Sequence, residues 1–318
     1  MAIRAKANVI FPSLALTAML IHPLAQAQDE PVTFDFYGKI NVSLQSNDLD
    51  DGTPSDTEII SNASRFGIKG GAQLDGDLEV IYQLEWEVDV ADLGGDDNIK
   101  ARNQFIGLKG NFGEFTVGRR DTALKLVQSG FDPFSDYAAD MKHIFAGKNR
   151  TKNTLSYFSP KFNQFQVAAS YVFAEDDFVD DGISLSLAYG DKKLKQTQFH
   201  AAIAVDDSVN GRDIVRAMGM TKVGDTQLGL LWQDQENVDG TGQADGWVAN
   251  VIQPWQNFSF KFQYQMMDFD DGDKSAIAAG ADYKLGANTI VYAWYTGRDL
   301  DNIDVQQRYL AIGIEHKF

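Results

Sequence analysis

Side chains that commonly carry out catalysis are few in this chain. Cysteine is absent, and three of the four histidines, His143, His200 and His316, lie beyond residue 27. The missing thiols exclude thiolate metal sites and cysteine nucleophiles. Neither the Gly-x-Ser-x-Gly turn of serine hydrolases nor the His-Glu-x-x-His pair of zinc proteases occurs. We therefore predict no catalytic residues, and an enzyme that assembles Ser, His and Asp in space is kept as a remote alternative.

Carboxylates are the most abundant candidates for binding chemistry. The chain has 45 Asp and Glu against 28 Lys and Arg, a formal charge of −17. This balance argues against nucleic acid as a partner, because phosphates require a basic surface. Two acidic runs, DLDDG at 48–52 and DFDDGD at 268–273, are superficially similar to calcium loops, but position twelve is Ile59 or Ala279 instead of the Glu of an EF-hand. We predict no metal site and no cofactor, and interpret these runs as solvated segments.

The elements that position these side chains are expected to be β-strands. In residues 32–45 the even positions are apolar or Gly, from Val32 to Leu44, whereas the odd positions carry polar groups. Residues 78–90 and 258–268 alternate in the same way. A period of two sorts side chains onto the two faces of a strand, whereas a helix would need a period near 3.6. The chain after residue 27 is therefore predicted to be all-β.

The same period, followed along the whole chain, predicts about sixteen strands. They lie near residues 32–45, 63–74, 78–90, 100–111, 114–120, 151–159, 164–173, 182–189, 193–205, 213–223, 225–235, 244–254, 258–268, 275–285, 289–299 and 307–318. Short connections rich in Gly, Asn and Asp, typical of tight hairpins, alternate with longer acidic ones. An up-and-down antiparallel barrel places alternate connections at opposite ends, so one rim is expected to be long-looped and negative.

The first 27 residues have the pattern of a cleaved signal peptide. Arg4 and Lys6 precede an apolar stretch, and the AQA at 25–27 matches the small-x-small cleavage pattern. The alternative is an N-terminal membrane anchor. Pro12 and Pro23 interrupt the stretch and leave an apolar core shorter than the roughly 20 residues of a spanning helix. We therefore expect the mature domain to comprise residues 28–318, exported to the outer membrane of a Gram-negative cell.

A soluble β-sandwich or a β-solenoid could also show this alternation. A sandwich usually has fewer strands, and a solenoid would show a fixed repeat length, which the chain lacks. A closed barrel satisfies every backbone hydrogen bond in lipid, and one of about sixteen strands leaves a lumen that side chains cannot fill. The pattern therefore favours a transmembrane channel.

Several motifs, in order along the chain, are similar to those of Gram-negative general diffusion porins. They are DFYGK at 35–39, SRFGIKG at 64–70, ARNQFIGLKG at 101–110, GRRDT at 118–122, NR at 149–150 with YFSP at 157–160, and the terminal HKF at 316–318. The resemblance spans essentially the whole mature chain. It implies a sixteen-stranded barrel, usually a homotrimer, with the third long loop folded into the lumen, and it makes the terminal Phe318 a signal for the outer-membrane assembly machinery.

The resemblance also implies a charged constriction. Carboxylates of the third loop, here residues 121–148, would face a row of basic side chains on the barrel wall. The loop carboxylates would be Asp132, Asp136 and Asp140, and the basic row would be Lys39, Arg65, Arg102 and Arg150. The two-residue period independently assigns Lys39 and Arg65 to the polar faces of their strands.

A constricted, water-filled channel for the passive diffusion of ions and small hydrophilic solutes is the function that these expectations favour. Opposed fixed charges across a narrow gap would orient dipolar solutes and disfavour apolar ones. A substrate-specific channel for an anion or a sugar is the main alternative, and an outer-membrane barrel enzyme is a remote one. The acidic rim attracts cations, whereas the basic row could offset it. Divalent cations could bridge the acidic loops to lipopolysaccharide phosphates.

Overall fold

The structure is a computed structural model that describes residues 32–49, 52, 54–92, 98–175 and 180–318. The predicted signal peptide and the expected start of the mature domain at residue 28 lie outside the described residues. The same holds for the acidic positions Asp50, Asp51, Asp96 and Asp97, and for the 176–179 segment.

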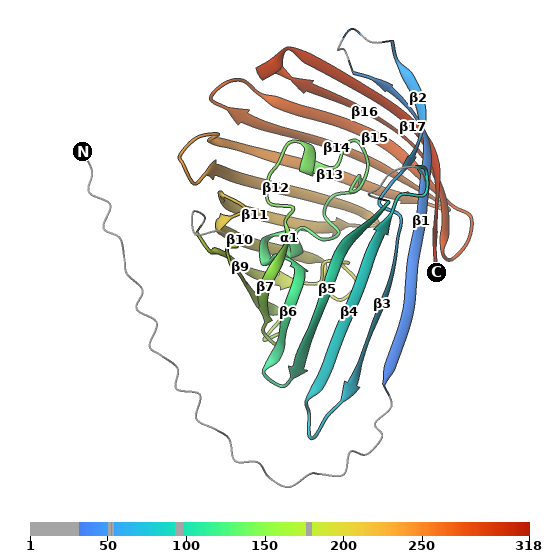
Figure 1. The fold of residues 1–318 in the computed structure, drawn as a ribbon. Helices are drawn as coiled ribbons and strands as arrows, with labels where there is room; N and C mark the ends of the chain where they lie inside the picture. The colour runs from blue at the N-terminus through green and yellow to red at the C-terminus, as the bar shows by residue number, and fades with distance from the viewer. Residues whose placement is uncertain (1–31, 50–51, 53, 93–97, 176–179) are drawn as a thin grey trace, which may run out of the picture.

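Strands account for most of the described chain (Figure 1). The strands are β1 Thr33–Asp48, β2 Asp56–Ser61, β3 Arg65–Gln73, β4 Glu79–Val88, β5 Ile99–Gly110, β6 Gly113–Asp121, β7 Arg150–Phe158, β8 Phe165–Val172, β9 Gly182–Gly190, β10 Phe199–Val209, β11 Arg212–Val223, β12 Thr226–Asn237, β13 Ala244–Trp255, β14 Phe258–Phe269, β15 Lys274–Lys284, β16 Thr289–Leu300 and β17 Val305–Lys317. The helices are α1 Ala123–Val127 and the 3-10 turns η1 Met141–His143 and η2 Asp301–Ile303.

Each strand pairs antiparallel with its neighbours in the chain, and β17 pairs back onto β1, so the sheet closes on itself. β2 and β3 act as one wall strand, because β2 pairs with residues 42–47 of β1 and β3 pairs with residues 33–39. Ala63, with a φ of 51°, lies at the break between them. The prediction of a closed antiparallel barrel of sixteen strands is therefore confirmed.

Most observed strand boundaries lie within three residues of the predicted ones, and two segments differ more. Residues 56–61 form strand β2 although they were assigned to an acidic connection, because their backbone pairs with β1. Strand β10 begins at Phe199 instead of residue 193. The carboxylate of Asp191 accepts hydrogen bonds from the amides of Lys193, Lys195 and Gln196, and this local capping holds the preceding residues in a turn.

The alternation of side chains separates an apolar outer surface from the interior. On β11, Ile214, Met218 and Met220 are buried, whereas Val215 is 46% exposed. Phe258, Phe260 and Phe262 of β14 are likewise exposed, and Gln263 and Gln265 are buried. Exposed apolar side chains on every second position are the outer surface that a membrane barrel presents to lipid. Among the described residues, no helix has the length and apolar character needed to cross a membrane.

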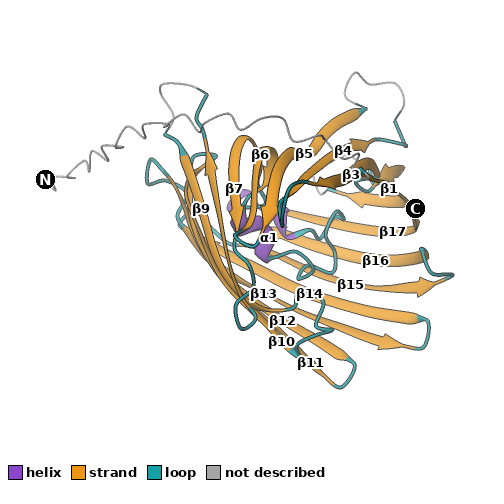
Figure 2. Ribbon diagram, turned by 90° about the horizontal axis from the view of Figure 1, so that it is seen from below, coloured by secondary structure: helices purple, strands orange, loops and turns teal. Residues whose placement is uncertain are grey.

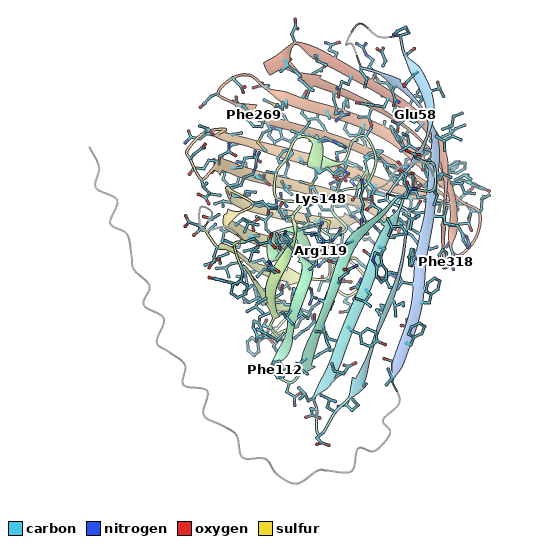
Figure 3. The ribbon with its side chains drawn as sticks, viewed as in Figure 1. Glu58, Phe112, Arg119, Lys148, Phe269 and Phe318 are labelled. Atoms are coloured by element: carbon cyan, nitrogen blue, oxygen red, sulfur yellow. The ribbon has the colours of Figure 1, made fainter. Side chains whose placement is uncertain are left out.

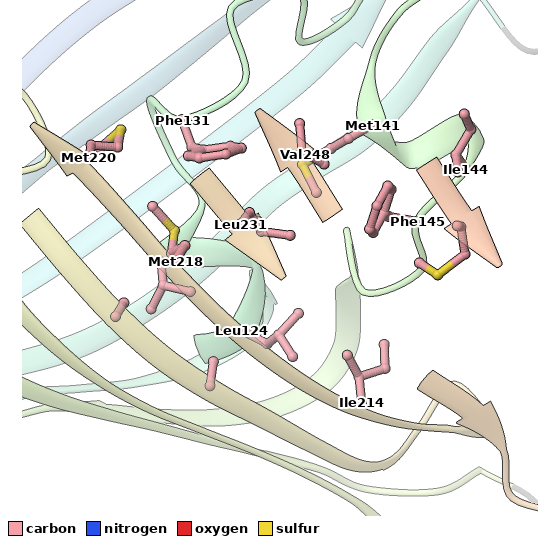
Figure 4. Packing of buried hydrophobic residues seen from close by; sticks show 14 of the residues in the cluster. Leu124, Phe131, Met141, Ile144, Phe145, Ile214, Met218, Met220, Leu231 and Val248 are labelled. Atoms are coloured by element: carbon pink, nitrogen blue, oxygen red, sulfur yellow. The ribbon is translucent and has the colours of Figure 1, made fainter. Parts of the chain in front are cut away.

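The longest connection, residues 122–149 between β6 and β7, folds inside the ring of strands (Figure 2) and is called the inner loop below. Its side chains Leu124, Phe131 and Phe145 are at most 2% exposed. They pack against inward-facing residues of the opposite wall, including Met218, Met220, Leu231 and Val248 (Figure 4). Since a fully buried Leu or Phe side chain contributes about 1.5–3 kcal/mol, this contact holds the loop against β10–β15.

A second set of buried side chains holds the middle of the inner loop. Phe134 and Tyr137 pack with Tyr292, Trp294 and Tyr309 of β16 and β17. The Tyr137 ring lies 5.0 Å from that of Tyr292 and 5.6 Å from that of Trp294. The inner loop is thus packed on one side of the lumen and leaves the wall of β1–β7 uncovered by apolar contacts.

The chain terminus completes the closure of the barrel. Gly38 and Phe318 exchange backbone hydrogen bonds of 3.0 and 3.1 Å, and the Phe318 ring lies 5.8 Å from that of Phe36. A Cβ atom on Gly38 would lie 2.5 Å from Cζ of Phe318 and 2.6 Å from the carbonyl oxygen of Arg65. Phe318 directly follows the last residue of β17. Figure 3 labels it together with Phe112, which lies in the short turn between β5 and β6. Only Gly therefore fits at position 38.

Replacing Gly38 by Ala should destabilise the barrel by about 1–3 kcal/mol, because the added methyl group overpacks the seam against a backbone carbonyl. Urea-induced unfolding in lipid vesicles measures this loss. Gly286→Ala is the matched control, since no atom lies within 4 Å of a Cβ there. Equal unfolding free energies for the two variants would contradict the proposed steric constraint.

Candidate functional site

The basic row predicted from the sequence lies along the part of the barrel wall that β1–β7 form. Lys39, Arg65, Arg102 and Arg150 belong to β1, β3, β5 and β7. Lys39 and Arg65 are direct partners in the register of β1 and β3. Their side chains are 8% and 25% exposed, so both charges are largely shielded from bulk water.

Carboxylates on the same wall pair with this basic row. Arg102 contacts Glu85 through Nε at 2.7 Å and Glu87 through Nη1 at 2.5 Å. Arg150 contacts Asp121 at 2.8 Å, and Asp121 also pairs with Lys125 at 2.9 Å. The sequence prediction omitted these carboxylates. The sequence does contain a signal for two of them, because Glu85 and Glu87 both lie on the polar face of the strand predicted at residues 78–90.

One carboxylate of the inner loop reaches across to the basic row. Asp136 lies 3.1 Å from Nζ of Lys39 and 3.8 Å from Nη1 of Arg65. Lys39 is shared with Glu315 of β17 at 3.4 Å. Asp136 has a φ of 75°, a conformation that costs energy for a residue other than Gly and that surrounding contacts must maintain.

The other two predicted loop carboxylates shape the loop itself. Asp132 accepts hydrogen bonds from the amides of Phe134 and Met141. Asp140 is fully buried, accepts from the amides of Asp136 and Lys142, and forms an ion pair with Lys148. The structure therefore places Asp136 against the wall, and it places Asp132 and Asp140 where they hold the turn that carries Asp136.

The surroundings of Asp136 and Asp132 shift the pKa values of these two carboxyl groups in opposite directions. Burial alone would raise the pKa of Asp136, but the positive charges of Lys39, Lys148 and Arg65 outweigh it and lower the pKa to about 2. Burial, followed by the negative charge of Asp140, raises the pKa of Asp132 well above its usual range. Asp136 is therefore a permanent negative charge at neutral pH.

A water-accessible space of about 410 Å³ lies between the inner loop and the basic row. Its charged lining consists of Arg65, Arg102, Lys125, Lys142, Lys148 and Arg150 together with Glu87, Asp121, Asp132 and Asp136. Lys39 and Asp140 are not part of this lining, and act on it through Asp136 and Lys148. Positive and negative groups from both the wall and the inner loop thus line the same aqueous space.

A buried arginine ties the inner loop to the opposite wall. Arg216 of β11 is 1% exposed. It donates hydrogen bonds to the side chain of Gln128, to the carbonyl of Ala146 at 2.8 Å and to Gln233 at 2.8 Å. These contacts join both ends of the inner loop to β11 and β12. The sequence did not predict a role for Arg216, because the residues around it on both faces of β11 are apolar.

Among the residues that the structure describes, no three His, Asp or Glu side chains converge in a way that could hold a metal ion.

The closed barrel, the apolar outer surface and the charged space beside the inner loop define a transmembrane β-barrel of the porin type. The chain belongs to the Gram-negative porin family, whose model matches residues 14–302. Family membership and fold together place the protein in the outer membrane.

Individual relatives agree with this assignment. The major outer membrane protein P.IB of Neisseria sicca is 31% identical over 168 residues, which cover 49% of this chain and 46% of the relative. The chain thus matches about half the length of that protein. The outer membrane porin protein 32 of Delftia acidovorans is 25% identical over 80% of each chain. The solved anion-selective porin from Comamonas acidovorans superposes with a TM-score of 0.78 at 21% identity, covering 91% of this chain and all of that one.

Replacing Arg216 by Met should lower the unfolding free energy by about 2–4 kcal/mol, because the carbonyl of Ala146 and the amides of Gln128 and Gln233 lose a buried donor. The inner loop should also become cleavable by an added protease. Arg308→Met is the control, since Arg308 is exposed and donates to Gln306 within its own strand. Protease resistance equal to that of the wild type would show that apolar packing alone holds the loop.

Replacing Asp136 by Asn should cost about 2 kcal/mol of stability at neutral pH, because the lowered pKa of this carboxyl measures its attraction to the basic groups. A lowered folded-state pKa adds stability above the unfolded value of 3.8, and this stability is lost as the pH falls towards 2. The difference between wild type and variant should therefore shrink between pH 4 and pH 2. Unfolding titrations at several pH values measure it, and a difference that stays constant with pH would contradict the assignment.

Proposed function

We propose that this protein is a water-filled channel through which ions and small hydrophilic solutes diffuse passively across the outer membrane. The observation that carries the proposal is the placement of Asp136 opposite Lys39 and Arg65, beside an aqueous space of about 410 Å³ inside a closed barrel. A barrel of this strand number is too wide for side chains alone to fill. The inner loop narrows it to an aqueous space that is lined by both positive and negative side chains.

Charges held on opposite sides of a narrow gap produce a field across the path of a solute. Such a field orients dipolar solutes and disfavours apolar ones, which would have to displace ordered water. No tight binding is required, because a solute that bound strongly would leave slowly. In this proposal Lys39, Arg65, Arg102 and Arg150 form the basic side of the constriction and Asp136 forms the acidic side. Asp132 and Asp140 contribute by holding the turn that presents Asp136.

The proposal extends to processing and assembly. Residues 1–27 would be removed as a signal peptide, and residues 28–318 would form the mature barrel. The resemblance to general diffusion porins supports a homotrimer and recognition of Phe318 by the outer-membrane assembly machinery. Acidic loop residues such as Asp270 and Asp271 would meet lipopolysaccharide phosphates through divalent cations, because two negative surfaces require a bridging charge.

We further propose that the protein does not act as an enzyme. Its curated relatives are porins. Its histidines His143, His200 and His316 belong to three separate elements, η1, β10 and β17. A substrate-specific channel for an anion or a sugar would differ from passive diffusion in one measurable way, since its flux would saturate as the solute concentration rises.

Asp136 and Arg65 carry opposite charges, so neutralising one or the other should change ion selectivity in opposite directions. Asp136→Asn should shift the permeability ratio towards anions and Arg65→Gln towards cations, each by roughly twofold, because one fixed charge is removed from the narrow gap. Reversal potentials in a salt gradient across planar bilayers measure both shifts. Asp225→Asn, in the exposed turn between β11 and β12, is the matched control.

Two outcomes would count against this account. Purified protein that inserts into bilayers and passes no ions would remove the channel function itself. Unchanged reversal potentials in both variants, with normal conductance, would keep the channel and remove Asp136 and Arg65 from its narrowest point.

A further inference from the structure

A second cavity, of about 460 Å³, lies where the end of the inner loop meets β11, β12, β14 and β15. Among the described residues that line it are four basic side chains, Lys142, Lys148, Arg212 and Lys274, and no Asp or Glu. This composition is unexpected in a chain with a formal charge of −17. Figure 3 places Lys148 in the middle of the barrel and Phe269, which also lines the cavity, near one end.

Two of these cations have no carboxylate partner among the described residues. Arg212 and Lys274 are the first residues of β11 and β15, which run in the same direction, so both lie at the same end of the barrel. No ion pair of either residue occurs in the described part of the chain, and Lys274 instead lies 4.4 Å above the ring of Phe269. The carboxylate next to Arg212, Asp213, accepts a hydrogen bond from the Ser208 amide instead.

The counter-charges of the other two cations lie on the inner loop. Lys142 lies 3.8 Å from Asp140, and Lys148 pairs with the same carboxylate, which is fully buried. Lys148 also attracts Asp136 and Asp132, and none of these carboxylates lines the cavity. Burial and the positive charges of Arg298 and Lys142 lower the pKa of nearby His143 to about 4, which is consistent with a positive potential here.

Two asparagines, Asn149 and Asn210, also line the cavity. Asn210 donates a hydrogen bond to the side-chain oxygen of Asn149 at 3.0 Å, and the amide nitrogen of Asn149 lies beside the carboxylate of Asp206, which is not part of the lining.

The cavity shares two of its lining side chains with the space beside the basic row. Lys142 and Lys148 border this space and also the 410 Å³ space beside the basic row. The inner loop thus presents the same two positive side chains to both spaces.

We propose that this cavity is a binding site for small soluble anions that carry two or more negative charges on carboxylate or phosphate oxygens, and that it loads the channel with them. This inference rests on the channel function proposed above. An Arg guanidinium binds two oxygens of such a group at once, and several cations together favour multivalent anions over chloride. The acidic loops then act as a general barrier to anions, and the cavity admits those that its charge pattern recognises.

Single-channel recording in potassium chloride tests the site, with citrate and pyrophosphate as the added probes. Both should block the wild-type current transiently, and block should require less probe when it is added on the side of the long loops. Arg212→Gln combined with Lys274→Gln should raise the half-blocking concentration at least about tenfold, a change equivalent to ~1.4 kcal/mol. Arg212→Lys combined with Lys274→Arg keeps the charge and should retain most of the block.

The control removes the same two charges elsewhere. Lys193→Gln combined with Lys195→Gln changes exposed side chains in the turn before β10, at the opposite end of the barrel, and should leave the block unchanged. Equal half-blocking concentrations in the wild type and the Arg212/Lys274 double variant would overturn the site. Absence of potassium chloride current in the wild type would instead contradict the channel function.

Discussion

Backbone N–H and C=O groups have no water to bond with in the hydrocarbon of a membrane, so each must find a partner within the protein. In this chain the requirement is met by pairing β17 back onto β1, which leaves the sheet without an edge. The seam is closed by Phe318 over Gly38, where a larger residue would meet backbone atoms. The lumen, the inner loop and the charged gap all depend on this closure.

A barrel of sixteen strands encloses more space than its own side chains can fill, and the inner loop occupies that space asymmetrically. Its apolar side chains pack on β10–β15, and Phe134 and Tyr137 pack on β16 and β17. Arg216 adds hydrogen bonds to both ends of the loop. The loop is consequently fixed against one wall, and its free side presents Asp136 to Lys39 and Arg65 on the other. In the same arrangement Lys142 and Lys148 line both aqueous spaces, so the inner loop forms part of the wall of each.

Fold class, strand number and most strand boundaries were predictable, because the two-residue period is a local property and tight turns have characteristic residues. The basic row was located by resemblance, with Lys39 and Arg65 also supported by strand periodicity. The function of each loop carboxylate was not predictable. Asp132, Asp136 and Asp140 are the same residue type within nine positions, and backbone hydrogen bonds decide which of them shapes the turn and which faces the wall.

The sequence by itself determined that the chain alternates between an outer apolar and an inner face, and that one set of connections is long and acidic. Those features depend on neighbouring residues and the geometry of a single strand. Only the tertiary structure decided that Glu85, Glu87 and Asp121 neutralise part of the basic row, and that Arg212 and Lys274 share a cavity free of carboxylates. Electrostatic interactions depend on distance, and these distances are established by the pairing of neighbouring strands and by the packing of the inner loop inside the barrel.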